Sequence, residues 1–185
     1  MDILQNRIVA GFLCLLIIIV FSVVGVASTL MPMRAQVTEL FHTGERGAPG
    51  VASDLSEISA QAFNLTVIAG RYLAPEYPGT ARVLNARENL TQSMQGRFSP
   101  REMRRAKDEL IGAAQILESS LNGLELTAQD QNLMATVMVE INSRSNLISQ
   151  SSYNQAAFAF NQSLGRFPAN ILGPAAGVRP LELFE

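Results

Sequence analysis

Apolar residues run without interruption through the first part of the chain. Residues 8–30 read IVAGFLCLLIIIVFSVVGVASTL and contain no charged or amide side chain. A helix of about 20 such residues crosses a hydrocarbon core of about 30 Å, whereas the apolar core of a cleaved signal peptide has about 7–15 residues. The pattern therefore predicts an uncleaved single transmembrane helix, with residues 1–30 forming the N-terminal tail and anchor.

Helical spacing continues beyond the apolar run. Met33, Val37, Leu40 and Phe41 recur on one side of a helix, which predicts that the anchor helix extends out of the bilayer to about His42. The glycine-rich stretch at 44–50, GERGAPG, should then end this helix.

Four more amphipathic stretches follow, and none of them alternates as a strand would. They cover about 53–73, 80–95, 100–121 and 127–164, the last as one helix of roughly 57 Å at 1.5 Å per residue. Ser53 is the expected N-cap of the first stretch, and Ser99 with Glu102 forms a capping box for the third. The sequence therefore predicts an all-α fold in which residues 31–166 form an antiparallel bundle of long helices. The inward positions expected on the 80–95 helix are Val83, Leu84, Ala86 and Leu90.

The final stretch, residues 167–185, has a different pattern. Pro168, Pro174 and Pro180 are incompatible with a regular helix, yet the stretch is too apolar for an ordinary disordered tail. We therefore expect an extended C-terminal tail that is ordered by docking against its own bundle or against a neighbouring subunit.

Composition argues against most kinds of chemistry. The net charge is −2, so there is no electrostatic case for nucleic acid, and the single Cys and single His leave few candidates for catalysis. Cys14 lies within the anchor, His42 falls near a helix end, and the acidic residues are scattered. We expect no enzyme activity, no metal site and no cofactor.

Residues 145–165, SNLISQSSYNQAAFAFNQSLG, contain no charged side chain. Interface cores are depleted in charge and enriched in aromatic residues. Phe158 and Phe160 point about 200° apart on a helix, so one should pack inside the protomer and the other against a neighbour. The alternative is a helix that is buried on most sides within its own bundle.

Two sets of residues are candidates for contact with a partner. The candidate oligomer or partner interface consists of Tyr153, Phe158, Phe160, Phe167, Ile171, Leu172, Leu181 and Phe184. The candidate contact with anionic lipid or an acidic partner consists of Arg101, Arg104, Arg105 and Lys107. For this second set the alternative is a solvated face paired with Glu102, Asp108 and Glu109.

The C-terminal third resembles the LemA family. The resemblance rests on Tyr153-Asn154-Gln155-Ala156-Ala157-Phe158-Ala159-Phe160-Asn161, on Phe167-Pro168-Ala169-Asn170-Ile171-Leu172 and on the ending Pro180-Leu181-Glu182-Leu183-Phe184-Glu185. Asn64-Leu65, Tyr72 and Ala86-Arg87 are similar to the family's upstream pattern. The resemblance implies an antiparallel helical domain beside a membrane and no agreed biochemical activity.

These observations together favour a membrane-anchored structural or scaffolding protein that self-associates into a homo-oligomer. The alternative is an adaptor or binding module that captures a peptide or a membrane-protein client. We expect a single-pass protein of the bacterial cell (inner) membrane. Charges on the two sides of the anchor almost balance, so the side of the domain stays open, with a periplasmic or extracytoplasmic placement preferred.

Overall fold

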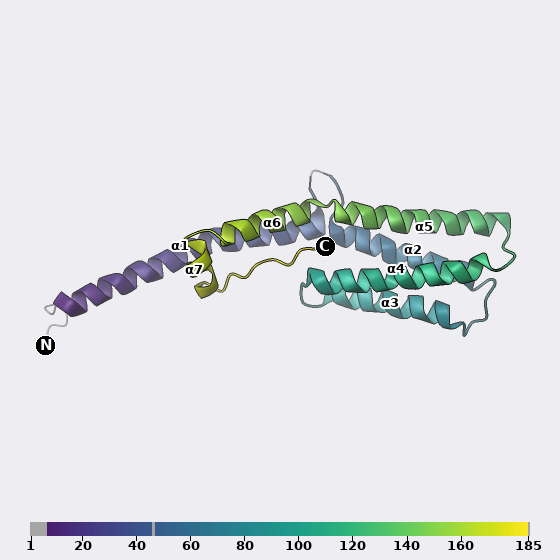
Figure 1. Ribbon diagram of the computed structural model, residues 1–185, viewed down its shortest axis with the longest axis horizontal. Helices are drawn as coiled ribbons and strands as arrows, with labels where there is room; N and C mark the ends of the chain where they lie inside the picture. The colour runs from purple at the N-terminus through teal and green to yellow at the C-terminus, as the bar shows by residue number, and fades with distance from the viewer. Residues whose placement is uncertain (1–6, 46, 185) are drawn as a thin grey trace. The chain divides into compact units, whose positions relative to one another are not determined.

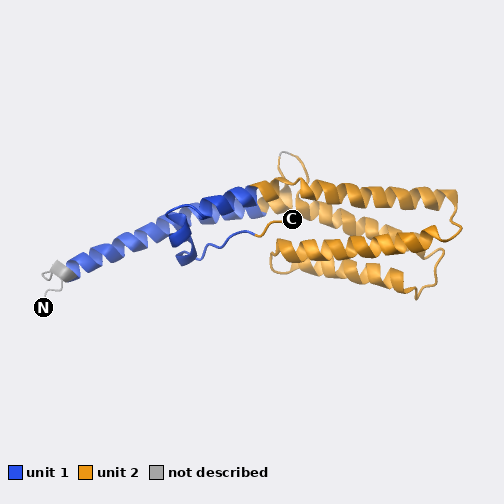
Figure 2. Ribbon diagram, viewed as in Figure 1, with its two compact units in different colours: residues 1–38, 156–181 blue, residues 39–155, 182–185 orange. Residues whose placement is uncertain are grey.

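The computed structural model describes residues 7–45 and 47–184, and every regular element in these ranges is an α-helix (Figure 1). The helices are α1 (Arg7–Thr43), α2 (Val51–Ala69), α3 (Pro78–Gln95), α4 (Pro100–Asn122), α5 (Ala128–Ser149), α6 (Ser152–Leu164) and α7 (Ala169–Ala175). The chain divides into two compact units, which Figure 2 distinguishes by colour. Unit 1 comprises residues 1–38 and 156–181, and unit 2 comprises residues 39–155 and 182–185. The all-α prediction is confirmed.

Helix α1 contains the whole described part of the apolar run and continues to Thr43, close to the end predicted at His42. Within the part of the chain that the structure describes, it is the one helix long and apolar enough to cross a membrane. Gly44 ends it with φ +73°, and its N–H donates to the carbonyl of Leu40 at 3.0 Å. A Cβ on Gly44 would lie 2.0 Å from the Ala48 carbonyl oxygen, so only glycine fits this C-terminal turn.

Unit 2 is built around the four helices α2, α3, α4 and α5. Short turns join successive helices, which therefore run antiparallel, as Figure 1 shows. Helix α2 contacts each of the other three, and α3 packs along α4. The hydrophobic effect holds this bundle together, since its fully buried apolar side chains come from all four helices. Those buried in α4 are Met103, Ala106, Leu110, Ala113, Ala114, Leu117 and Leu121.

Two local predictions about the bundle are wrong. The N-cap of α2 is Gly50, not Ser53, because the helix starts early enough to bury Val51. Leu84 is exposed on α3, whereas Val83, Ala86 and Leu90 are buried as predicted. The apolar stripe of α3 is narrow, and Leu84 lies 100° round the helix from Val83.

The predicted single helix over 127–164 is also wrong, because the chain breaks at Gln150 and Ser151 between α5 and α6. The Ser151 N–H turns back to the carbonyl of Ile148 at 3.1 Å, and the Ser149 hydroxyl donates to the carbonyl of Ser145 at 3.1 Å. Serine side chains compete for backbone hydrogen bonds in this way, and several of them lie together here. Helix α5, before the break, packs along α2.

The C-terminal stretch is only partly extended. Residues Ala169–Ala175 form the short helix α7, with Pro168 at its N-cap and Pro174 in its last turn. The prediction that prolines exclude regular helix therefore fails over this segment, because a one-to-two-turn helix has few N–H donors that proline could remove. Residues 178–184 have no regular secondary structure, as expected.

The start of α4 provides a test of the fold. The Ser99 hydroxyl accepts a hydrogen bond from the Glu102 N–H at 3.4 Å, as the capping box predicts. We expect Ser99→Ala to lower the free energy of unfolding by about 1 kcal/mol. The matched control is Ser119→Ala on the exposed side of the same helix, which should be neutral or slightly stabilising. Chemical denaturation of both variants measures this, and equal losses in the two would contradict the cap.

Candidate functional site

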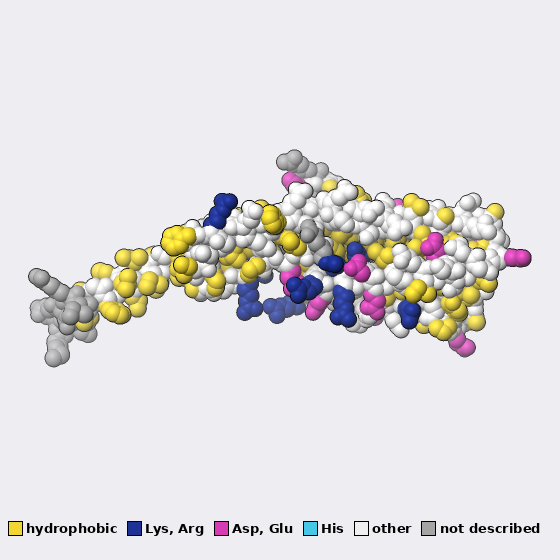
Figure 3. Space-filling view, in the orientation of Figure 1, with side chains coloured by type: hydrophobic (Ala, Val, Ile, Leu, Met, Phe, Trp, Pro, Cys, Tyr) yellow, Lys and Arg dark blue, Asp and Glu magenta, His cyan; other side chains and the backbone are white. Residues whose placement is uncertain are grey.

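Apolar side chains of α1 are exposed on every face of the helix. Residues 11–22 are all exposed, and a helix of 3.6 residues per turn points them in all directions. Phe12 and Phe21 are 71% and 73% exposed. Side chains over this part of α1 are hydrophobic or uncharged on the face shown in Figure 3. A soluble monomer rarely exposes a contiguous apolar surface of more than a few hundred Å².

Helix α7 and the turn before it lie against α1 within unit 1. Between them is a hollow of about 430 Å³, called here the α1–α7 hollow. It is lined by Ile18, Ile19, Ser22, Gly25, Val26, Phe167, Pro168, Ile171 and Leu172. Gly173 makes the close approach: a Cβ there would lie 2.6 Å from Leu164 Cδ1 and 3.8 Å from Leu30 Cδ1. Ser22 has the one polar side chain in this lining, so the hollow is better suited to apolar groups than to a polar ligand.

An asparagine holds the tail segment of unit 1. The Asn161 Nδ2 donates to the Leu181 carbonyl at 2.8 Å, and the Leu181 N–H donates to Asn161 Oδ1 at 2.8 Å. The side-chain amide thus pairs with both backbone groups of one residue, as a neighbouring strand would. Since residues 178–184 lack regular structure, side chains must satisfy these backbone groups.

A second clamp lies in unit 2, at the start of α6. The Tyr153 hydroxyl donates to the Glu182 carbonyl at 2.7 Å, and the Phe184 N–H donates to Asn154 Oδ1 at 2.8 Å. Tyr153 is fully buried, and Asn154 and Phe184 are nearly so. Glu182 and Phe184 are therefore bound by the adjacent pair Tyr153 and Asn154.

Aromatic rings pack around this second clamp. Phe41 contacts Phe98, Tyr153 and Phe184 with centroid distances of 5.1, 5.2 and 5.9 Å. His42 lies edge-on to Phe41 at 5.5 Å. Edge-to-face pairs of this kind add to the free energy gained by apolar burial. The only histidine of the chain is thus a packing residue beside the cluster formed by Phe41, Phe98, Tyr153 and Phe184.

The predicted basic set is divided by the structure. Arg101, Arg104 and Arg105 are exposed, whereas Lys107 is buried, 5.9 Å above the ring of Phe184. The Lys107 Nζ also bonds Asp108 at 3.0 Å and Ser145 at 3.4 Å, so Lys107 cannot belong to an exposed lipid-binding face. Helical spacing explains the correction, because Lys107 lies four residues after buried Met103.

Glu182 was not among the predicted site residues, yet it caps α4. Its Oε2 accepts hydrogen bonds from the Ser99 hydroxyl at 3.0 Å and from the Arg101 N–H at 3.3 Å. A carboxylate at a helix N-terminus satisfies a donor without an intrahelical partner and matches the helix dipole. No local pattern predicts this contact, because Ser99 and Glu182 are 83 positions apart in the sequence.

The eight candidate interface residues separate into two groups. Tyr153, Phe160, Leu181 and Phe184 are buried inside the protomer, so they are not available to a neighbour. Phe158, Phe167 and Ile171 are 55%, 80% and 63% exposed, and Leu172 is half-buried. Phe158 and Phe160 do point to opposite sides, one outward and one inward, as their spacing predicts.

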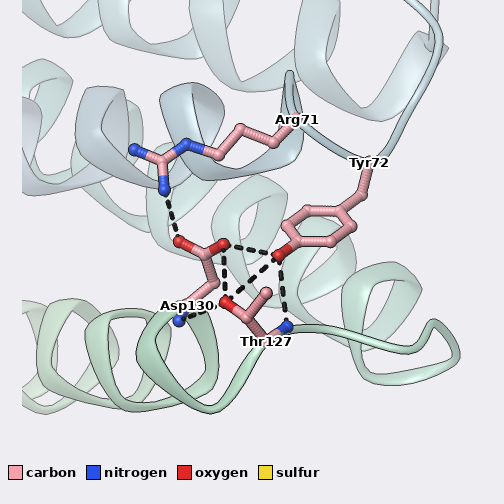
Figure 4. Close-up of polar contacts among 4 residues, drawn as sticks. All are labelled: Arg71, Tyr72, Thr127 and Asp130. Carbon is pink, nitrogen blue, oxygen red and sulfur yellow. Dashed lines mark hydrogen bonds and ion pairs between the residues drawn. The ribbon is translucent and has the colours of Figure 1, made fainter.

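A polar network joins the end of α2 to the start of α5 (Figure 4). The nearly buried Asp130 carboxylate accepts hydrogen bonds from Arg71 Nη1 at 2.5 Å, from the Tyr72 hydroxyl at 2.5 Å and from the Thr127 hydroxyl at 3.0 Å. The Tyr72 bond lowers the pKa of Asp130 below its ordinary value, and the Thr127 and Arg71 contacts add to this effect against the opposing effect of burial. These hydrogen bonds tie the end of α2 to the start of α5.

A second ion pair joins the start of α2 to the last part of α5. Arg144 Nη1 lies 3.1 Å from Asp54 Oδ1, and Arg144 Nε lies 2.7 Å from Glu140 Oε1. The hydrogen bonds to Glu140 and Asp54 raise the pKa of Arg144. From the sequence alone, Asp54 is expected only to lie in the first turn of a helix. Its burial beside Arg144 could not be predicted, because it depends on how α2 and α5 pack.

The structure brings no metal-binding constellation together. Among residues 7–45 and 47–184, no group of three or more His, Cys, Asp or Glu side chains lies close enough to hold an ion. A hollow of about 340 Å³ in unit 2, called here the polar hollow, lies between the 44–51 loop and the α5–α6 break and is lined by polar as well as apolar residues.

No protein-family model, no curated protein and no solved structure matches the chain.

The aromatic cluster generates a stability prediction. Phe184→Ala should lower the free energy of unfolding by about 3 kcal/mol, because a buried ring and its contact with the Phe41 ring are lost. The control is Leu183→Ala, the half-buried neighbour in the same segment, which should cost clearly less. Denaturant titration of the full chain in detergent provides the comparison, and a Phe184→Ala loss no greater than that of the control would refute the clamp.

The Asp130 network generates a prediction of pH dependence. The folded pKa is below the unfolded value of about 3.9, so the carboxylate stabilises the fold above that pH and loses this effect as pH falls through the folded pKa. The stability advantage of the natural chain over Asp130→Asn should therefore be full near pH 6 and shrink below about pH 4. Tyr72→Phe, which removes the main cause of the shift, should weaken the same pH dependence. Thermal unfolding across this range measures it, and an advantage that grows on acidification would contradict the network.

Proposed function

We propose that this protein is a single-pass membrane protein whose helical domain acts as a scaffold by self-association. The observation that carries the proposal is the exposure of α1 on all faces over residues 11–22. Between Arg7 and Arg34 the chain contains no charged residue. In lipid, such a helix can expose its apolar side chains without the free-energy cost of exposing them to water.

The outward face of α6 supports self-association. Its exposed residues are Gln155, Phe158, Ala159 and Gln162, and none is charged. A face turned permanently to water normally carries Lys, Glu or Arg. An aromatic side chain surrounded by small or amide residues is instead the composition of an interface core. The membrane anchor would confine protomers to one plane and so raise their effective concentration.

The polar hollow in unit 2 favours the second candidate, an adaptor for a peptide or a membrane-protein client. Its wall includes backbone of the 44–51 loop together with Leu147, Gln150 and Ser151. The Ser151 hydroxyl is buried and has no hydrogen-bond partner within the described residues. A captured peptide backbone would supply one. Composition of a pull-down separates the two functions: mostly the chain itself supports the scaffold, and one stoichiometric foreign protein supports the adaptor.

Membership in the LemA family is a further part of the proposal. The residues that carry the resemblance, Tyr153, Asn154 and Asn161, are those that bind the C-terminal segment. The same assignment favours a bacterial inner membrane with the domain on its extracytoplasmic side. Protease accessibility in spheroplasts tests that side directly.

Self-association is tested by adding a charge to the outward face of α6. We expect Phe158→Lys to weaken self-association at least about tenfold, or about 1.4 kcal/mol, because an unpaired ammonium would be buried in the contact. Leu84→Lys places the same charge on an exposed apolar position of α3 and should leave the mass unchanged. Light scattering in mild detergent measures both. A natural chain that is monomeric at all concentrations would refute self-association.

A further inference from the structure

The turn between α6 and α7 and the start of α7, together called the turn here, lie along the apolar run of α1. Phe167, Pro168, Ile171 and Leu172 line one side of the α1–α7 hollow, and residues 18–26 of α1 line the other. At 1.5 Å per residue, the distance from Leu30 down to Ile18 is about 18 Å along α1. The turn is therefore beside the anchor itself and not beside its water-exposed extension.

Any placement of a bilayer on α1 includes this level. A span of about 20 residues that begins as early as possible covers residues 8–27, and this still contains all of 18–26. A later start moves the span towards Leu30 and takes the turn deeper. If α1 crosses a membrane, the turn beside it must enter the same hydrocarbon layer.

The turn has the composition that lipid requires. Residues 164–178 contain one charged side chain, Arg166. Arg166 lies in the sequence between Leu164 and Phe167. Leu164 packs with Gly173 near Leu30, and Phe167 faces residues 18–26. Its long aliphatic stem allows the guanidinium to reach the headgroup layer from this level. Phe167 and Ile171 then project apolar surface that is more than half exposed.

The backbone of the turn is also largely satisfied without water. The Asn170 N–H donates to Arg166, the Leu172 N–H to Pro168 and the Val178 N–H to Gly173, at 2.9, 3.1 and 2.9 Å. Pro168 and Pro174 have no N–H to satisfy. Irregular backbone at membrane depth is tolerated only where its polar groups are bonded internally or buried in protein.

We propose that residues 165–176 form a re-entrant membrane element, a second insertion beside α1 whose Phe167 and Ile171 side chains contact lipid acyl chains. The proposal rests on the anchoring of α1 proposed above. It reassigns Phe167, Ile171 and Leu172 from a protein interface to lipid. The element returns to the water-exposed side of the bilayer, since Gly177 and Val178 lie beside Met31, Arg34 and Thr38 of α1.

The chain has no tryptophan, so one introduced residue reports its own depth. Three matched variants of the full chain are Phe12→Trp in the anchor, Phe167→Trp in the turn and Phe63→Trp at an exposed position of α2 in the bundle. Each is reconstituted into phosphatidylcholine vesicles with or without bromine on the acyl chains. Bromine quenches tryptophan that it contacts. Each variant is also titrated with acrylamide, which quenches from water.

We expect Phe12→Trp and Phe167→Trp to lose most of their fluorescence in brominated vesicles and to resist acrylamide. Phe63→Trp should behave in the opposite way. Ile171→Trp should repeat the result of Phe167→Trp and guards against a local disturbance at one position.

Three outcomes overturn the proposal, and they are distinguishable. In the first outcome, bromine quenches Phe12→Trp but not Phe167→Trp, and acrylamide reaches Phe167→Trp. This result supports the anchor and contradicts the re-entrant element. Protection of Phe167→Trp from both quenchers assigns the turn to a protein contact, such as a second copy of the chain. Absence of bromine quenching at Phe12→Trp removes the anchor and with it both proposals.

Discussion

The constraint on which this structure depends is that the surface of α1 over residues 11–22 is apolar on all sides. A helix in the core of a soluble domain buries such residues against neighbours, and here they are exposed. Taking apolar surface out of water gains roughly 25 cal/mol per Å². Helix α1 gains this free energy only if lipid or protein covers these side chains. The placement of α7 along residues 18–26 follows from the same constraint, because its side chains share that environment. If this environment is lipid, as proposed, residues 164–178 must carry almost no charge, and Arg166 is the one charged side chain among them.

The end of the chain is held by side chains that replace missing secondary structure. Asn161 pairs with both backbone groups of Leu181, and Asn154 and Tyr153 bind Phe184 and Glu182. Asparagine is suited to this because its amide carries a donor and an acceptor in the geometry of a peptide group. These contacts explain why an uncharged, amide-rich segment is useful inside a protomer. From sequence, its lack of charge is compatible with an external interface or with burial inside the protomer. Burial accounts for Tyr153, Asn154 and Phe160, and the external interface stays a prediction for the outward face around Phe158.

Local signals predicted the helices well where they dominate. Apolar spacing identified α1 through α4, and the Ser99 cap and the Thr127 start fall where the structure has them. The errors come from competition between local and tertiary terms. Burial of Val51 moved the start of α2, and several serines together outweighed the helical pattern at Gln150. The helix α7 was missed because proline is compatible with the ends of a helix this short.

The candidate sites were less predictable, because they depend on contacts between distant residues. Asp130 meets Tyr72 across 58 positions, and Glu182 meets Ser99 across 83. No periodicity in one segment encodes such a pair. Lys107 shows the same limit: its charge indicated a surface, but its place on the helix put it over Phe184.

The claim that α1 is embedded in lipid is tested most directly by alkaline carbonate extraction of membranes that contain the full chain. Carbonate releases proteins held at the surface by polar contacts, whereas a helix inserted in the hydrocarbon core stays in the pellet. The account predicts full-length chain in the membrane pellet. Release of the chain into the supernatant would contradict it.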